Sequence, residues 1–138
     1  MDMYFSAKRQ TLAQFMEVYD PQRLHEVHGG STIVFDAMAH QPPQDRYDIV
    51  RFLIAQGAEL TGTNSENETL FHILFSRPKH NMAQTVELTK LLIDAGADIN
   101  QPDAKGRVAL QYLISHPKLT DRDMAPLYDL LFTRCRLD

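Results

Sequence analysis

The chain has 138 residues, of which 43% are hydrophobic, and its formal net charge is −4. This length is typical of one domain, and a core of this size folds without a disulfide or a bound metal. The apolar fraction argues against disorder. The 14 basic and 18 acidic residues are interleaved, so the concentrated positive charge that a nucleic acid attracts is missing. We therefore expect no nucleic-acid partner.

The compartment is inferred from what the chain lacks. Its one cysteine, Cys135, excludes an internal disulfide and is typical of a reducing compartment. The first ten residues contain no apolar signal-peptide core, and no window approaches 18 consecutive apolar residues. We expect a cytoplasmic protein that has no membrane partner.

The N-terminal segment predicts one helix followed by a short second one. Residues 6–19 carry an apolar stripe at helical spacing, with Ser6 as the expected N-cap. The stripe consists of Leu12, Phe15, Met16 and Tyr19. Asp20-Pro21 ends this helix and favours a new short helix that runs to about Val27. Residues 1–27 are interpreted as an N-terminal helical cap.

Three copies of one unit follow. In residues 86–100, VELTKLLIDAGADIN, apolar residues fall at i, i+3, i+4 and i+7, and Gly96 stands where a helix is capped. The same pattern occurs 39 residues earlier, ending at Gly57, and again 39 residues later at residues 127–131. Each copy therefore predicts a long outer helix. Pro126 favours a start of the last one at Asp123, or a kink at Pro126 itself.

Each copy also predicts a shorter first helix, at residues 32–40, 69–77 and 108–116, with prolines directly after it. The connectors 58–68 and 97–107 are polar and rich in turn-forming residues, which indicates protruding hairpin-like turns. Asn81 and Gln84 have the spacing of a capping box, and Asp45 and Thr120 stand at similar points as expected caps. No alternating strand-length run is found, so the prediction is all-α.

The segment from Asn64 to His72, NSENETLFH, resembles the ankyrin signature in which Asp, Gly and Thr-Pro-Leu-His recur at fixed offsets. Asn64 stands for the Asp and Asn67 for the Gly, while Asp103 and Gly106 match outright in the next copy. The resemblance covers residues 28–138, although 39 residues per copy exceed the family's 33 or so. It implies an ankyrin-like helical solenoid of three helix-pair repeats, 28–63, 64–102 and 103–138, with an N-terminal helical cap.

What the resemblance implies for function is non-enzymatic binding of another protein through turn tips and inner helices. The positions carried over to this chain are, at the turn tips, His28, Ser31, Ser65, Glu66, Glu68, Ala104, Lys105 and Arg107, and, on the inner helices, His40, Ser76, Arg77, Ser115 and His116. These residues differ between copies, as on a binding surface or on an unselected solvated one. An immunity protein that neutralises a cognate toxin is the more specific alternative, and an enzyme or enzyme regulator is a minor one.

No pattern in the chain points to catalysis, a metal or a cofactor. His72 occupies a place that is structural in the ankyrin pattern, where it bonds the turn backbone. His25 and His28 have a spacing that two metal ligands can use, but no third ligand is evident. Cys135, at the place of the capping glycine, has no neighbouring base and is interpreted as a packing residue.

The last copy raises the question of what covers the C-terminal end. Its apolar residues have no following repeat in the sequence; they are Val108, Leu113, Leu127 and Leu131. Polar residues on the outward side, a second copy of the chain or a partner protein are the three alternatives. The polar candidates are Gln111, Asp129, Arg134 and Arg136. A monomer is favoured, and a homodimer through this repeat is the alternative.

Overall fold

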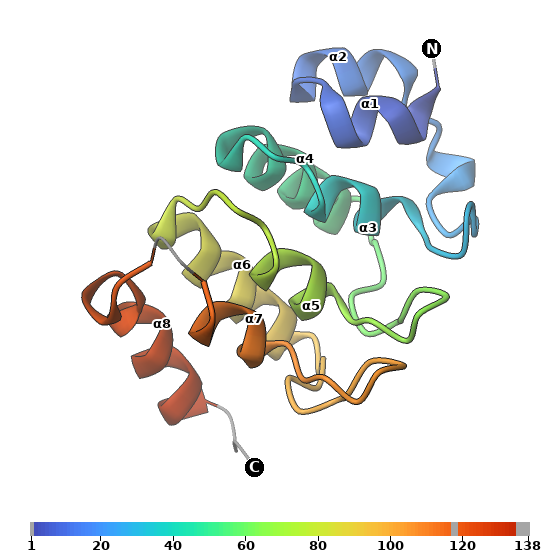
Figure 1. The fold of residues 1–138 in the computed structure, drawn as a ribbon. Helices are drawn as coiled ribbons and strands as arrows, with labels where there is room; N and C mark the ends of the chain where they lie inside the picture. The colour runs from blue at the N-terminus through green and yellow to red at the C-terminus, as the bar shows by residue number, and fades with distance from the viewer. Residues whose placement is uncertain (1, 117–118, 135–138) are drawn as a thin grey trace.

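The computed structural model describes residues 2–116 and 119–134, and over these residues the chain is all-helical (Figure 1). The helices are α1 Met3–Arg9, α2 Leu12–Val18, the 3₁₀ helix η1 Pro21–Arg23, α3 Ile33–Met38, α4 Pro43–Ala55, α5 Leu70–Phe75, α6 Met82–Asp94, α7 Leu110–Ile114 and α8 Asp121–Arg134. The described residues form no strand, only an isolated bridge between His28 and Ser31. The all-α prediction is confirmed.

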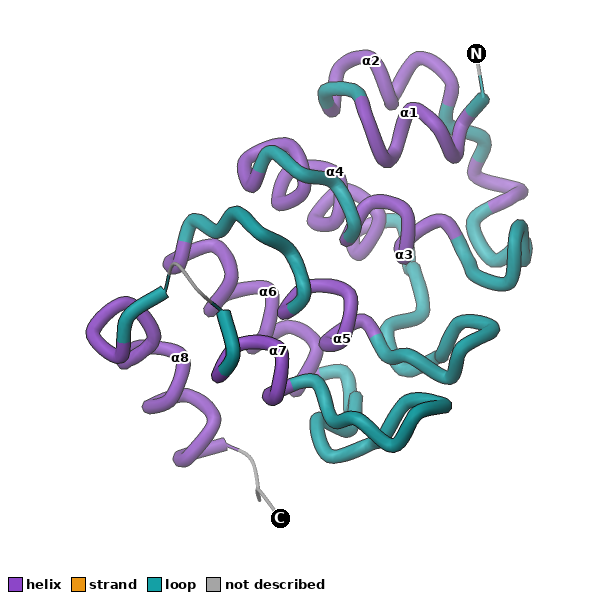
Figure 2. Tube along the Cα trace, in the orientation of Figure 1, coloured by secondary structure: helices purple, strands orange, loops and turns teal. Residues whose placement is uncertain are grey.

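The helices stack in two layers. One layer contains α1, α3, α5 and α7, each in contact with the next, and the other contains α2, α4, α6 and α8 in the same order. Contacts of α1 with α2, of α3 with α4 and of α5 with α6 join the layers into helix pairs. The long connecting loops lie together along one side of this stack (Figure 2). The N-terminal cap is therefore built as a helix pair, like the units that follow it.

The outer helices begin and end for the reasons that the sequence indicates. The Asn81 side chain accepts a hydrogen bond from the Gln84 amide at 3.2 Å, which caps α6. Gly57 and Gly96, just after α4 and α6, have φ of 96° and 92°, a conformation that favours glycine. The predicted glycine caps are confirmed. Gln84, however, sends its amide group to Gln44 Oε1 at 2.8 Å rather than back to its own cap.

The predicted single helix over residues 6–19 is wrong, because the chain breaks there into α1 and α2. Asp2 caps α1 through the Tyr4 amide, so Ser6 is a buried interior residue of α1 and not an N-cap. Thr11 and Gln14 form a capping box that starts α2. The box satisfies amides that a continuous helix would otherwise bond. The short helix predicted after Asp20 is confirmed at its start, with Asp20 as its cap, but as the 3₁₀ helix η1 it ends at Arg23 and not near Val27.

The predicted start of the last outer helix at Asp123 is also wrong. Helix α8 begins at Asp121, and Pro126 lies inside it. The Thr120 hydroxyl accepts from the Asp123 amide at 3.1 Å, and the Asp123 carboxylate accepts from the Thr120 amide at 3.0 Å. This reciprocal cap fixes the start of α8 ahead of the proline, and Pro126 then removes one backbone donor inside the helix. Thr120 is a cap as expected, whereas Pro42, and not Asp45, occupies the N-cap of α4.

One hydrophobic core runs through the stack and reaches its C-terminal end. Leu113, Leu127 and Leu131 are fully buried and Val108 is half-buried, so the described residues cover these side chains themselves. The large apolar side chains exposed at this end are Ile114 and Phe132, at 64% and 70%. Cys135 and Arg136 lie outside the described residues, as does the side chain of Arg134. No helix in the described ranges is long and apolar enough to span a bilayer.

Candidate functional site

Two of the connecting loops repeat one turn geometry. The side-chain oxygen of Asn64 accepts hydrogen bonds from the amides two and four residues later, each at 3.0 Å. Asp103 accepts from the equivalent amides at 2.9 Å. Asn67 and Gly106 both have positive φ, 58° and 78°. The equivalence of Asn64 with Asp103, and of Asn67 with Gly106, is thus confirmed in the backbone.

Backbone groups join successive turns into one surface. The amide of Ala104 donates to the carbonyl of Glu66 at 2.9 Å, and the Asn67 side chain donates to the carbonyl of Pro102 at 3.1 Å. Gly30 lies directly against Ser65, where an added Cβ would come within 2.7 Å. The turns therefore lie side by side at one edge of the molecule (Figure 1). We call residues 28–31, 64–68 and 103–107 the turn ridge.

Most predicted tip residues are accessible on the turn ridge. The exposed ones are His28, Ser65, Glu66, Ala104 and Lys105, and the half-buried ones are Ser31, Glu68 and Arg107. Arg107 is committed to the fold, because its Nε donates to the buried Asp103 carboxylate at 3.0 Å and its guanidinium lies 5.4 Å from the centre of the Tyr112 ring. Burial raises the pKa of Asp103, but hydrogen bonds from the Arg107 and Lys105 amides outweigh it and lower the pKa. Asp103 is therefore held as a carboxylate.

The inner-helix positions that were expected to be exposed range from buried to exposed in the structure. His40 is 2% exposed, and its Nε2 lies 2.7 Å from the carbonyl oxygen of Gln10, so its assignment to the binding surface is wrong. Arg77 is half-buried and donates to the carbonyls of Ile73 and Ala39 at 3.1 and 3.3 Å. Ser76 is half-buried and donates to the same Ile73 carbonyl. Ser115 is exposed and His116 is half-buried.

His72 holds two neighbouring turns together. The side chain is fully buried, its Nδ1 accepts from the Thr69 amide at 3.0 Å, and its Nε2 lies 2.8 Å from the carbonyl oxygen of Arg107. Both ring nitrogens are therefore occupied by the backbone. The predicted structural role of His72 is confirmed.

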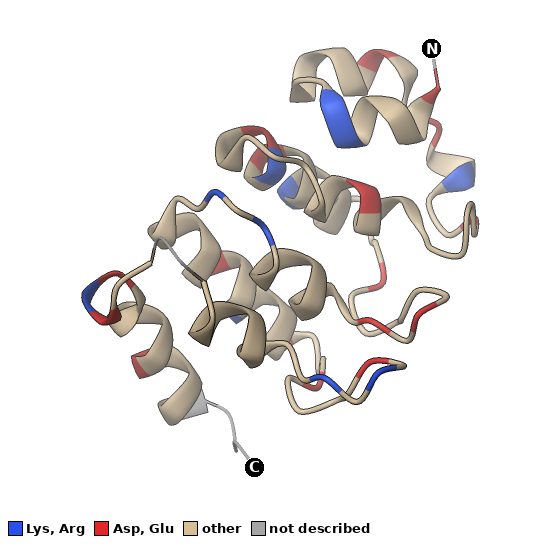
Figure 3. Ribbon diagram, viewed as in Figure 1, with Lys and Arg blue, Asp and Glu red and all other residues tan. Residues whose placement is uncertain are grey.

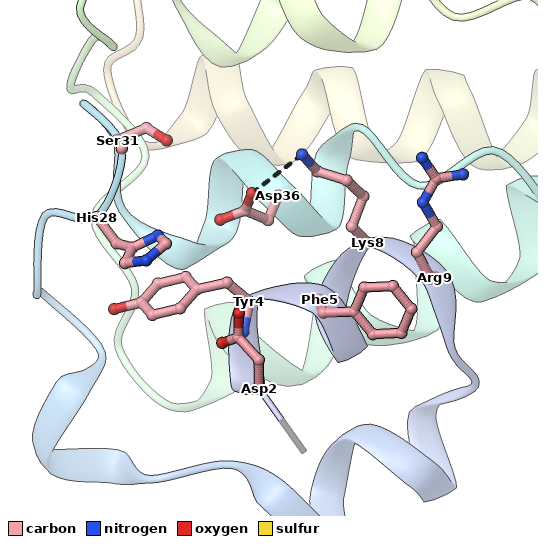
Figure 4. A pocket seen from close by; sticks show the side chains of 9 residues that line it. Asp2, Tyr4, Phe5, Lys8, Arg9, His28, Ser31 and Asp36 are labelled. Carbon is pink, nitrogen blue, oxygen red and sulfur yellow. Dashed lines mark hydrogen bonds and ion pairs between the residues drawn. The ribbon is translucent and has the colours of Figure 1, made fainter.

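A pocket of about 490 Å³ lies where α1 and α3 meet the first turn (Figure 4). It brings the predicted tip residues His28 and Ser31 together with residues that the sequence did not suggest. The full lining is Asp2, Tyr4, Phe5, Lys8, Arg9, His28, Gly29, Ser31 and Asp36. The Lys8 and Arg9 side chains extend from α1 toward α3 (Figure 4).

The floor of this pocket is a carboxylate with one unused oxygen. Lys8 Nζ lies 3.6 Å from Asp36 Oδ1, while Asp36 Oδ2 is buried and has no hydrogen-bond partner. Burial raises the pKa of Asp36, and Lys8 opposes this. At the pocket wall, the rings of Tyr4 and His28 stack with centroids 4.1 Å apart. Burial, with a hydrogen bond to Glu26, raises the pKa of Tyr4 to about 12. These residues offer both donors and acceptors to a ligand.

The sequence did not single out Lys8 or Arg9, because residues 1–27 were interpreted only as a cap, and it did not single out Asp36, which lies within the first predicted inner helix. The signal in the sequence that could have indicated this pocket is the adjacent pair Lys8 and Arg9 in the last turn of α1. Among residues 2–116 and 119–134, no three His, Cys, Asp or Glu side chains are grouped so that they could hold a metal ion.

Comparisons with known proteins find the same fold elsewhere but do not indicate an activity. No family model matches the chain, and no curated protein matches it. Solved structures do match, in 195 chains. One of them is a protein of unknown function from Leptotrichia buccalis C-1013-b, with a TM-score of 0.82 and 27% sequence identity over 98% of this chain and 74% of that one. The chain thus shares its all-helical fold with this protein.

Proposed function

We propose that the chain is an ankyrin-type solenoid that binds another protein without catalysis, through the turn ridge and the exposed parts of the inner helices. The observation that carries this proposal is the turn ridge itself. Its tips lie side by side and are joined by backbone hydrogen bonds, while Ser65, Glu66 and Lys105 point outward as exposed side chains. A rigid scaffold with variable exposed tips is suited to recognition.

Binding through the turn ridge should require little ordering of the backbone. Loops that are disordered before binding lose conformational entropy when a partner fixes them. The turns of the ridge are fixed in the free chain by the Asx-type bonds of Asn64 and Asp103 and by the contacts between turns. Binding therefore requires little change of backbone shape. We expect the interface to form from side chains that are already in place.

The non-enzymatic proposal is consistent with the way that the fold uses two of its six histidines, His40 and His72. His72 is buried with both ring nitrogens bonded, and His40 is buried against the Gln10 carbonyl. Neither has the accessible nitrogen that general acid–base catalysis requires.

The test is affinity capture from the cells that produce the chain, with a ridge variant beside the wild type. Glu66→Lys with Lys105→Glu reverses two exposed tip charges and leaves the net charge unchanged. Glu17→Lys with Lys90→Glu is the matched control, because both positions are exposed on α2 and α6 of the other layer.

We expect one stoichiometric partner protein that the wild type and the control retain and the ridge variant loses. If no partner is captured, or if the ridge variant retains it as well as the control does, the turn ridge is not the binding surface. A toxin among the captured proteins would narrow the proposal to immunity.

A further inference from the structure

A second pocket, of about 230 Å³, lies beside the one in Figure 4 and carries a strong charge of one sign. It is lined by Lys8, Arg9, Ala39, Gln41 and Arg77. Three of these five residues are cationic and none is acidic. We call this set the basic pocket. Figure 3 shows cationic residues in α1 and in the loop after α5, whereas the turns of the ridge carry residues of both signs.

The charge at the back of the basic pocket is not neutralised by the fold. Arg77 donates only to the carbonyls of Ile73 and Ala39 and to the Ser76 hydroxyl. Behind it lies Arg46, only 1% exposed, which donates to the carbonyls of His40, Gln41 and Lys79. In the described part of the chain neither arginine forms an ion pair with a carboxylate.

The guanidinium groups of Arg46 and Arg77 are both desolvated and lie close enough to repel each other. Burial, and next the charge of Arg77, lower the pKa of Arg46 to about 10. Burial also lowers the pKa of Arg77, which Glu68 opposes. Carbonyl dipoles satisfy the hydrogen bonds but bring no negative charge, and a buried charge without a counter-charge costs free energy. A bound anion at this place would recover part of that cost.

The front of the basic pocket is accessible. Lys8 pairs with Asp36 at 3.6 Å, yet its side chain is 46% exposed. Arg9 is exposed and forms no ion pair within the described residues. Next to it, Phe5 is 51% exposed and its ring lies beside the Arg9 side chain (Figure 4). An anion at this place meets donors from α1 and from Arg77 together with an apolar neighbour.

We propose that the basic pocket binds a carboxylate side chain in an acidic segment of the partner protein. Guanidinium groups match a carboxylate in geometry as well as charge. The volume suits one side chain of a larger partner, since pockets for whole small molecules usually have about 300–1,000 Å³. This inference rests on the proposed function and names the chemistry of the partner. The basic residues are interleaved with acidic ones along the chain, so the row of many cations that a phosphate backbone needs is missing, and a nucleic acid is disfavoured.

The test uses a fluorescein-labelled hexaglutamate peptide and fluorescence anisotropy with the full chain. We expect saturable binding that weakens with added salt, while hexaglutamine does not bind. Arg9→Glu weakens binding of hexaglutamate by about tenfold, because an accessible cation becomes an anion next to the bound carboxylate. Arg9 makes no bond that the fold needs, so circular dichroism should show an unchanged melting temperature.

Lys90→Glu is the matched control, because it makes the same change of net charge on α6, in the other layer of the stack. It should leave hexaglutamate affinity within about twofold. The proposal is overturned if hexaglutamate does not bind, or if Lys90→Glu weakens it as much as Arg9→Glu does. Tighter binding of an oligothymidylate with the same dependence on Arg9 would also overturn it, in favour of a nucleic acid.

The same variants separate this inference from the proposed function. If a partner is captured and depends on the turn ridge but is unaffected by Arg9→Glu, the binding module stands and the basic pocket is not part of its interface. Loss of capture with Arg9→Glu, together with loss of hexaglutamate binding, supports both.

Discussion

His72 and Arg107 belong to successive units, and one ring nitrogen connects them: Nε2 of His72 lies 2.8 Å from the carbonyl oxygen of Arg107. Because Nδ1 accepts from the Thr69 amide, Nε2 carries the proton and donates it to that carbonyl. In the next unit, Gln111 stands at the corresponding place, and its Oε1 accepts from the Val108 amide at 2.8 Å. Gln111 thus makes the bond within its own turn that His72 makes with Thr69.

Replacement of this histidine should destabilise the fold. His72→Ala removes both bonds and leaves a cavity at a fully buried position, so we expect the free energy of unfolding to fall by about 2–4 kcal/mol. Urea denaturation followed by circular dichroism measures it. His25→Ala is the control, since His25 is exposed, and should change stability by less than about 0.5 kcal/mol. Equal effects of the two variants would contradict the role assigned to His72.

The outer-helix core is tested at Leu92, which is 1% exposed. Leu92→Ala should cost about 2–5 kcal/mol, because it opens a cavity between packed helices. Chemical denaturation is again the measurement, and Ile114→Ala, at a position that is 64% exposed, serves as the comparison. A loss below about 1 kcal/mol for Leu92→Ala would mean that the repeat register is misassigned.

Adjacent glycines in the first turn offer a matched pair. Gly29 and Gly30 have φ of 63° and 90°, but a Cβ would meet nothing within 4 Å at Gly29 and would come within 2.7 Å of Ser65 at Gly30. Gly29→Ala should therefore cost about 1 kcal/mol for the left-handed backbone alone. Gly30→Ala should cost about 1–3 kcal/mol more, because it forces the first turn away from the second. Thermal unfolding of both variants checks the difference, and a smaller loss for Gly30→Ala would show that these turns do not touch.

Acid should weaken the fold through His80. Burial, and next the charge of Arg46, lower the pKa of His80 to about 4 from an ordinary value of 6.5. Between these pH values the unfolded chain binds a proton that the folded chain does not, so stability is complete above pH 6.5 and falls as the pH drops toward 4. We expect a loss of roughly 1–2 kcal/mol, less than full linkage because the ring is partly solvated.

The measurement is urea denaturation at several pH values for the wild type and for His80→Gln. Asp36, whose pKa is raised by burial, also titrates on the acid side, so the difference between the two proteins isolates the histidine. Parallel pH profiles would contradict the assignment, whereas a flatter profile for His80→Gln would support it.

Much of this fold is predictable because it is local. The apolar stripe that ends at Gly96 predicts α6 and its C-terminal cap. Asn64 and Asp103 predict their turns, because their side chains bond to amides two and four residues later. These signals lie within a few residues of the structure they determine. The break between α1 and α2 is also local, but the Thr11–Gln14 capping box is masked by an apolar spacing that continues across it.

The surface assignments depended on packing that the sequence does not display. His40 and Arg77 were placed on the exposed side of short helices, yet both turn toward carbonyls of the preceding unit, those of Gln10 and Ala39. The face that such a helix presents to its neighbour is set by the stack as a whole. The basic pocket was missed for the same reason, since Arg9 and Arg77 meet there only after α1, α3 and α5 are stacked.

Neighbouring turns are held together through main-chain carbonyls, which His72 and Asn67 reach with their side chains, and through the packing of Gly30 against Ser65. The identities of Glu66, Ala104 and Lys105 therefore contribute little to folding. A library randomised at these three positions should retain the fold in most of its members. Under the proposed binding function, selection from such a library would change the specificity of the chain without redesign of the parts that keep it folded.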